Sequence, residues 1–246
     1  MDALEPVNGI NLHWEMRGEG APLLLLHGFM GCAANWRLVF PEPPAGFRLV
    51  APDMRGHGRS TNPSGVFSFR AAGLDVVALL DRLGIERANA IGVSGGGQVL
   101  LQVATTAPSR LDAMVIVSGA HYFPEQARAI MRQTTPEGAS DDLWRQMRSF
   151  HPGGDDQILA LWRQAHDFAD ADDPHFTPEQ LAGIRARTLV VHGSADPFYP
   201  TEVMEDLRAS IPGAHLWVIP GAGHGPIFGH QTAPFLDRAL AFLRTQ

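Results

Sequence analysis

Residues 91–98, "IGVSGGGQ", place one serine among four glycines directly after an apolar run. Ser94 lies at the centre of a G-x-S-x-G pattern that begins at Gly92 and ends at Gly96, and a helix-like segment follows it. On such a turn between a strand and a helix, the serine hydroxyl is exposed and the glycines leave room for close backbone. A glycine-rich hinge is the alternative interpretation, and the rest of the chain decides between the two.

Short apolar runs alternate with helix-length amphipathic segments along most of the chain. Strands are predicted at residues 10–17, 22–28, 47–53, 88–94, 111–119, 187–193 and 214–221. Helices are predicted at residues 68–83, 96–107, 201–210 and 232–244. Several apolar runs are continuous, as in strands that are buried on both faces. This order predicts the α/β fold class, with a mostly parallel doubly wound sheet covered by helices.

The alternation stops once, between residues 121 and 182. This segment has no strand-like run, but it has helical patterns at residues 125–133, 141–150 and 155–170. We therefore expect a helical cap over 121–182, inserted into an α/β core formed by 1–120 and 183–246. The cap would cover the carboxyl ends of the strands, where open α/β sheets bind their ligands.

The charge balance limits the classes of partner. The net charge of −7 argues against binding to nucleic acid or to an anionic membrane, since both need a positive surface. All 19 basic residues are arginine, which excludes Schiff-base catalysis and a P-loop lysine. A small-molecule substrate is the partner that the sequence predicts.

The single cysteine and the N-terminal stretch indicate which cofactors and which cellular location to expect. Cys32 is the only cysteine, so it has no partner for an internal disulfide, and no Cys/His cluster has zinc spacing. The residues imply neither a metal nor an organic cofactor. No apolar run has the length of a membrane span, and the acidic N-terminal stretch lacks a secretory signal, so a cytoplasmic location is expected.

The stretch "LLLLHGFMG" (23–31) is the first companion of the serine motif. After the buried run, Gly28 lets the loop backbone turn its N–H groups toward Ser94. The N–H of Phe29, or that of Met30, would form an oxyanion hole together with the N–H of Gly95. His27 is interpreted as a structural histidine that supports this loop.

The other two companions are an aspartate and a histidine on loops near the end of the chain. Asp196 follows an apolar run in "VVHGSADPFYP" (190–200), and His224 lies in the glycine-rich "IPGAGHGPIF" (219–228). Taken alone, an Asp-Pro pair is a turn signal. With Ser94, however, these residues follow the chain order serine, aspartate, histidine that is expected for α/β-hydrolases.

With these motifs the sequence resembles the α/β-hydrolase superfamily over nearly its whole length. The stretch "APDMRGHGRS" (51–60) is similar to the P-D-x-R-G-x-G-x-S segment of that family, which is structural there. The resemblance implies a helical cap over 121–182 and a catalytic triad of Ser94, Asp196 and His224. It implies no particular substrate, because one fold supports many chemistries.

These residues predict a serine hydrolase that acts on carboxylic esters of small to medium acyl or aryl groups. His224 would take the proton of Ser94, Ser94 would attack the acyl carbon, and Asp196 would orient the imidazole. Activity is expected to fall in acid, since an imidazolium accepts no proton. Epoxide hydrolases and haloalkane dehalogenases of the superfamily carry aspartate in place of this serine, so they are excluded. The expected substrate-binding residues are Met30, Trp36, Phe123, Trp144, Trp162, Phe198, Ile227 and Phe228.

Three alternatives share the same triad. A carbon–carbon bond hydrolase of ring-cleavage dienoic acids would need a cation for the substrate carboxylate, and the cap offers four arginines: Arg132, Arg145, Arg148 and Arg163. A cofactor-free perhydrolase would use peroxide in place of water. A ligand receptor that turns over very slowly would be labelled without continued product release.

Overall fold

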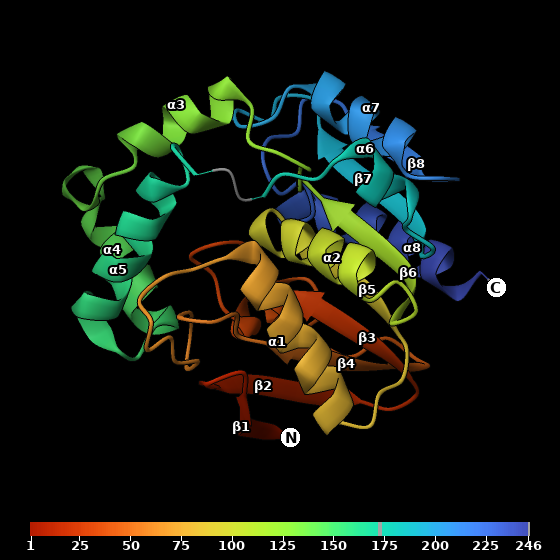
Figure 1. Cartoon of the computed structure of the whole chain (residues 1–246), viewed down its shortest axis with the longest axis horizontal. Helices are drawn as coiled ribbons and strands as arrows, with labels where there is room; N and C mark the ends of the chain where they lie inside the picture. Colours follow the sequence, from red (N-terminus) through yellow and green to blue (C-terminus); the bar gives the residue numbers. More distant parts are fainter. Residues whose placement is uncertain (172–173, 246) are drawn as a thin grey trace.

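The computed structural model describes residues 1–171 and 174–245, and in them eight strands form one sheet (Figure 1). The strands are β1 (Asp2–Val7), β2 (Ile10–Gly18), β3 (Ala21–Leu26), β4 (Phe47–Pro52), β5 (Ala88–Val93), β6 (Leu111–Val117), β7 (Arg187–Gly193) and β8 (His215–Ile219). Their order across the sheet is β1-β2-β4-β3-β5-β6-β7-β8. The pairs β1–β2 and β2–β4 are antiparallel, and all other neighbours are parallel. The predicted fold class is confirmed.

Helices cover both faces of this sheet. The helices that flank it are α1 (Phe69–Arg82), α2 (Gly95–Thr106), α6 (Pro178–Ala182), α7 (Thr201–Ser210), α8 (Thr232–Arg244) and the short 3-10 helix η1 (Ala33–Leu38). Side chains of α1, α2 and α7 share one core with Leu24 and Leu26 of β3. Those of η1 and α8 share the other core with Leu23 and Leu25. Because successive strand residues face opposite sides, a run of four leucines fills both cores.

Most predicted elements agree with the structure, and the strand and the α-helix that were not predicted are short. The helices at residues 201–210 and 232–244 and the strand at 187–193 are confirmed to the residue. The strand β1 is absent from the predictions, because its side chains alternate between exposed and half-buried at the edge of the sheet. Helix α6 is also absent from them, since its five residues are too few to show helical periodicity.

The chain between β6 and β7 forms a separate group of helices. It contains α3 (Glu125–Gln133), α4 (Asp141–Phe150), α5 (Gly154–Asp167) and the single turn η2 (Pro136–Gly138) before α6. Figure 1 shows α3, α4 and α5 together beyond the ends of the strands, apart from the helices that flank the sheet. The helices predicted at 125–133 and 141–150 are confirmed. In the described residues no helix combines the length and the apolar character that crossing a membrane requires.

The segment after β4 is fixed by the carboxylate of Asp53. This carboxylate accepts hydrogen bonds from the N–H groups of Ala33 (2.6 Å) and Arg59 (2.9 Å), and its Oδ2 lies 2.6 Å from Nδ1 of His13. Burial alone would raise the pKa of Asp53, but these hydrogen bonds hold it below its usual value. An ionised Asp53 therefore ties the segment after β4 to strand β2 and to the start of η1.

Candidate active site

Ser94 lies on the turn between β5 and α2, with a backbone φ of +51°. Such an angle is unfavourable for any residue with a side chain, so the surrounding chain must impose it. A Cβ on Gly92 would lie 2.4 Å from the carbonyl oxygen of Gly96, and a Cβ on Gly96 would lie 2.2 Å from that of Leu26. Both positions require glycine because backbone occupies the space of a side chain.

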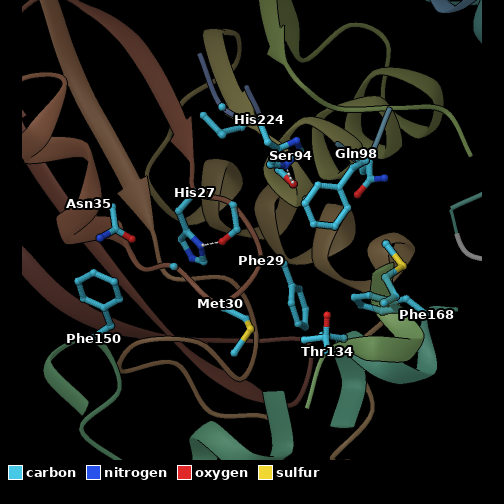
Figure 2. A pocket seen from close by; sticks show the side chains of 18 of the residues that line it. His27, Phe29, Met30, Asn35, Ser94, Gln98, Thr134, Phe150, Phe168 and His224 are labelled. Carbon is cyan, nitrogen blue, oxygen red and sulfur yellow. Dashed lines mark hydrogen bonds between the residues drawn. The ribbon is translucent and has the colours of Figure 1, made fainter. Parts of the chain in front are cut away.

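The side chains of Ser94, His224 and Asp196 form one hydrogen-bonded chain. Nε2 of His224 lies 2.9 Å from Oγ of Ser94, and its Nδ1 lies 2.8 Å from Oδ2 of Asp196 (Figure 2 shows the first of these bonds). An ionised carboxylate only accepts hydrogen bonds, so Nδ1 of His224 carries the proton and Nε2 is left to accept from the serine hydroxyl. The sequence placed these residues on three separate loops, and the structure brings them together.

Asp196 is held ionised by its surroundings. Its side chain is fully buried, and the N–H groups of Phe198 (2.8 Å) and Tyr199 (3.3 Å) donate to its Oδ1. Burial alone would raise the pKa of this carboxyl, but the hydrogen bonds from His224 and from the two backbone groups lower it. The carboxylate is therefore both charged and fixed in orientation.

The loop that carries His224 is attached to its neighbours on both sides. The N–H of Ala195 donates to the carbonyl of Ala222 (2.9 Å), and the N–H of Gly225 donates to Oγ of Ser118 (3.2 Å). A Cβ on Gly193 would lie 2.3 Å from the Ala222 oxygen, so the approach of the two loops requires glycine there. The imidazole is thus placed by three strand ends.

The backbones of Phe29, on the loop after β3, and of Gly95, directly after Ser94, lie close together. A Cβ on Gly95 would lie 3.2 Å from the nitrogen of Phe29, so the two backbones are in contact. Gly95 is the first residue of α2, where an N–H has no partner within the helix. Within the described chain, neither N–H donates a hydrogen bond to another residue. Both are available to an oxygen bound beside Ser94.

His27 supports the loop that carries Phe29 through two hydrogen bonds to backbone groups. Its Nε2 accepts from the N–H of Met54 (2.9 Å), and its Nδ1 donates to the carbonyl of Gly28 (2.8 Å). Burial lowers the pKa of His27, so the ring stays neutral, as both hydrogen bonds require. The contacts agree with the structural role expected for this residue.

A second buried histidine reaches the same loop from the helices between β6 and β7. His151 follows α4, its Nδ1 accepts from the N–H of Gly58 (2.9 Å), and its Nε2 donates to the carbonyl of Met30 (3.1 Å). Burial lowers the pKa of His151, which keeps Nδ1 free to accept. Met30 has a φ of +65°. Sequence analysis did not single out His151, because a histidine in a turn signal carries no sign of its distant partners.

A cavity of about 470 Å³ has Ser94 in its lining (Figure 2). Five of the eight expected substrate-binding residues line it: Met30, Trp36, Phe123, Phe198 and Phe228. Side chains that sequence analysis did not name also line it, among them Gln98, Thr134, Gln146, Phe150, Phe168 and Tyr199. The signal for Gln98 is its position four residues after Ser94, which puts the two residues on the same side of the helix.

Three of the expected substrate-binding residues do not line the cavity. Trp144 and Trp162 pack on each other, with ring centroids 4.8 Å apart, in a small core between α4 and α5. Ile227 is fully buried in the core beneath α8. The expectation for these residues was wrong. An apolar stripe on a helix does not reveal which neighbour the two tryptophans cover, and Ile227, on the loop after β8, turns into the core.

The four arginines proposed as anchors lie away from the cavity. Arg132 pairs with Glu125 and Asp170, Arg145 with Asp142, and Arg148 with Asp155. Arg163 is exposed on α5. Among the residues that the structure describes, the cavity lining contains no arginine and no carboxylate.

Buried histidines predict how stability depends on pH. Burial lowers the pKa of four of them in the folded protein: His27, His57, His151 and His192. The unfolded chain therefore binds more protons as the pH falls through about 6.5, and each histidine weakens folding there by at most about 1.4 kcal/mol per pH unit. His13 acts in the opposite direction: burial alone would lower its pKa, but the hydrogen bond to Asp53 raises it.

We expect the urea midpoint to fall between pH 7.5 and 5.5. His57, whose Nε2 has no hydrogen-bond partner in the described residues, is the site for the control. His57→Leu should show a smaller fall over the same interval, because the variant has one fewer histidine that must stay neutral. Equal midpoints at both pH values in the unmodified protein would contradict the assignment.

Comparison with known proteins places this architecture among hydrolases. A model of the alpha/beta hydrolase fold matches residues 21–181. The chain is 30% identical to 2-hydroxymuconate semialdehyde hydrolase of Pseudomonas sp. (strain CF600), over 88% of this chain and 84% of that protein. A meta-cleavage product hydrolase from Pseudomonas fluorescens IP01 is similar in structure, with a TM-score of 0.75, 26% identity and coverage of 95% and 94%. A hydrolase from Pseudomonas aeruginosa PA01 has a TM-score of 0.80 and 26% identity, with coverage of 99% and 98%.

Proposed function

This chain belongs to the alpha/beta hydrolase fold family, and from that premise we propose that it hydrolyses neutral carboxylic esters through an acyl-enzyme on Ser94. One observation carries the proposal. The hydrogen-bonded chain of Ser94, His224 and Asp196 opens into a cavity whose lining is mostly apolar and without arginine or carboxylate in the described residues. A nucleophile in such a cavity suits an uncharged acyl group.

The proposed reaction has two halves. Nε2 of His224 takes the proton of Ser94 while Oγ forms a bond to the acyl carbon, and the N–H groups of Phe29 and Gly95 stabilise the oxyanion. The carbon–oxygen bond to the alcohol then breaks, and the alcohol leaves with the proton from His224. Water next gives its proton to His224 and attacks the acyl carbon, and the acid leaves as Ser94 recovers its proton. Asp196 stabilises the imidazolium in both halves.

The named relatives make carbon–carbon bond hydrolysis the second candidate. A ring-cleavage dienoic acid carries a carboxylate, and a buried carboxylate without a cation is costly. Within the described residues the lining offers no arginine. Of the four candidate arginines, three pair with carboxylates and Arg163 is exposed. The charge of the cavity therefore favours esters over dienoates.

The size and rim of the cavity favour small to medium acyl or aryl groups. Its volume of about 470 Å³ lies in the lower half of the range for small-molecule sites. Two apolar side chains of the lining are exposed to solvent, Leu38 by 67% and Phe228 by 41%. An apolar group entering at this rim would cover surface that is otherwise in contact with water.

We also propose that residues 121–182 act as a cap over this site. Thr134 follows α3, Phe150 ends α4 and Phe168 follows α5, and all three line the cavity. The α/β core of 1–120 and 183–246 supplies Ser94 and its partners. In this arrangement the core supplies the reacting side chains, and the cap determines which acyl groups fit the cavity.

Initial rates on p-nitrophenyl esters from acetate to decanoate test the proposal. We expect turnover with an optimum among the small to medium acyl groups, because the acyl chain and the p-nitrophenyl ring must share a cavity of about 470 Å³. Disappearance of a yellow ring-cleavage dienoate without ester turnover would instead establish carbon–carbon bond hydrolysis. A single burst of p-nitrophenol would indicate a slow receptor, and oxidation that requires peroxide would indicate a perhydrolase.

A further inference from the structure

The apolar cavity has one buried polar pair beside the nucleophile. Gln98 and Tyr199 both line the cavity and are 1% and 2% exposed, and Nε2 of Gln98 donates to the hydroxyl of Tyr199 (3.2 Å). We propose that this pair recognises a hydroxyl group on the acyl chain of the substrate, so that the preferred substrates are esters of hydroxy acids. The inference rests on the proposed ester hydrolysis and adds the substrate class.

Position along α2 sets the distance between the pair and the reacting carbon. Gln98 lies four residues after Ser94, which is about 6 Å along the helix axis. Figure 2 shows Gln98 and Ser94 at the same side of the cavity. A hydroxyl on the third carbon of an acyl chain is three bonds from the carbonyl carbon, and an extended chain of that length spans a separation of this order. A 3-hydroxyacyl ester is therefore the matching probe.

The hydrogen-bonding capacity of the pair is only half used. Oε1 of Gln98 accepts no hydrogen bond from the described residues, and the Tyr199 hydroxyl finds no acceptor among them. Burial and the neighbouring Asp196 raise the pKa of Tyr199, so its phenol remains a donor. Since unpaired polar groups in an apolar cavity are costly, a substrate group that both donates and accepts is favoured. A hydroxyl does both, and it suits either orientation of the Gln98 amide.

A purely structural role makes a different prediction. The N–H of Tyr199 donates to Asp196, so Gln98 also steadies the loop that holds the carboxylate. Loss of that support would slow every ester to the same extent. Loss of recognition would slow the hydroxylated ester alone, because only that ester makes the missing hydrogen bond. The ratio of two substrates therefore separates the roles.

The experiment compares kcat/KM for p-nitrophenyl 3-hydroxyhexanoate and p-nitrophenyl hexanoate. We expect the unmodified enzyme to prefer the hydroxylated ester by about tenfold or more, as one buried hydrogen bond would give. Gln98→Met keeps the length of the side chain and Tyr199→Phe keeps its ring, and each should reduce the preference to within about twofold. Gln102→Met makes the same change one turn further along α2, outside the cavity lining, and should keep the preference.

Two outcomes would overturn the inference while leaving ester hydrolysis intact. They are an equal rate on both esters by the unmodified enzyme, and an equal loss on both esters in Gln98→Met. If neither ester is turned over, the proposed function fails, and binding still tests the pair. Quenching of tryptophan fluorescence then gives Kd of each ester for Ser94→Ala with and without Gln98→Met. Tighter binding of the hydroxylated ester that Gln98→Met abolishes would support the pair, and equal binding would refute it.

Discussion

Ser94→Ala is expected to lower kcat/KM on p-nitrophenyl esters by on the order of 10⁴-fold or more. The variant lacks the only hydroxyl that is bonded to Nε2 of His224 in the described residues, so no acyl-enzyme forms. The fold should persist, since an alanine side chain at this position would meet the same backbone conformation with one atom fewer. Ester assays together with circular dichroism check both parts of the expectation.

Covalent labelling gives this prediction a second measurement. A fluorophosphonate probe should label the unmodified protein on one serine and should leave Ser94→Ala unlabelled. Ser149→Ala, on the exposed face of α4, is the matched control and should be labelled and active as before. A Ser94→Ala variant that keeps more than a few per cent of the activity would show that another residue is the nucleophile.

Asp196→Asn should produce the second large effect, a loss of about 10⁴-fold in kcat with little change in KM. In the unmodified protein the Asp196 carboxylate accepts a hydrogen bond from the Nδ1–H group of His224. The Nε2 atom that faces Ser94 therefore carries no proton. An asparagine amide that donates to Nδ1 would reverse the tautomer, so Nε2 would carry a proton and accept none from serine. Steady-state kinetics across the neutral pH range measure the loss.

The control for this substitution is Asp206→Asn, which makes the same chemical change on the exposed side of α7. It should retain the activity of the unmodified enzyme. A normal kcat in Asp196→Asn would mean that His224 is oriented by other contacts, such as those of its loop with Ser118 and Ala195. It would also remove Asp196 from the proposed mechanism.

The sequence predicts the central part of this fold well, because there the physical signals are strong. Continuous apolar runs such as Leu23–Leu26 occur only where both faces of a strand are covered, and their order along the chain defines an α/β sheet. The edge of the sheet is predicted less well. Strand β1 pairs with β2 over its whole length, yet its exposed side chains carry no apolar pattern. Pairing at a sheet edge is made by the backbone, which sequence patterns do not report.

The candidate site is likewise predicted only in part: its reacting side chains are predicted, but most of its cavity walls are not. Ser94, Asp196 and His224 each follow a predicted strand, so the topology alone directs them to one edge of the sheet. The cavity walls depend on how helices turn about their own axes, and Trp144 and Trp162 therefore packed against each other instead of the cavity. The helix predicted at 155–170 ends at Asp167, and Phe168 then packs against Phe29, with centroids 4.8 Å apart.

The hydrogen bonds of His151 tie the helices between β6 and β7 to the loop that carries Phe29 and Met30. This side chain joins the connection between α4 and α5 to the carbonyl of Met30, the residue that follows Phe29 in the chain. A movement that lifted these helices far enough to admit bulk water would also release the Met30 peptide and loosen the donors beside Ser94. Opening of the site would therefore weaken the oxyanion hole at the same time, and deacylation would be confined to the closed form. The interlock would protect the intermediate from competing acyl acceptors in solution.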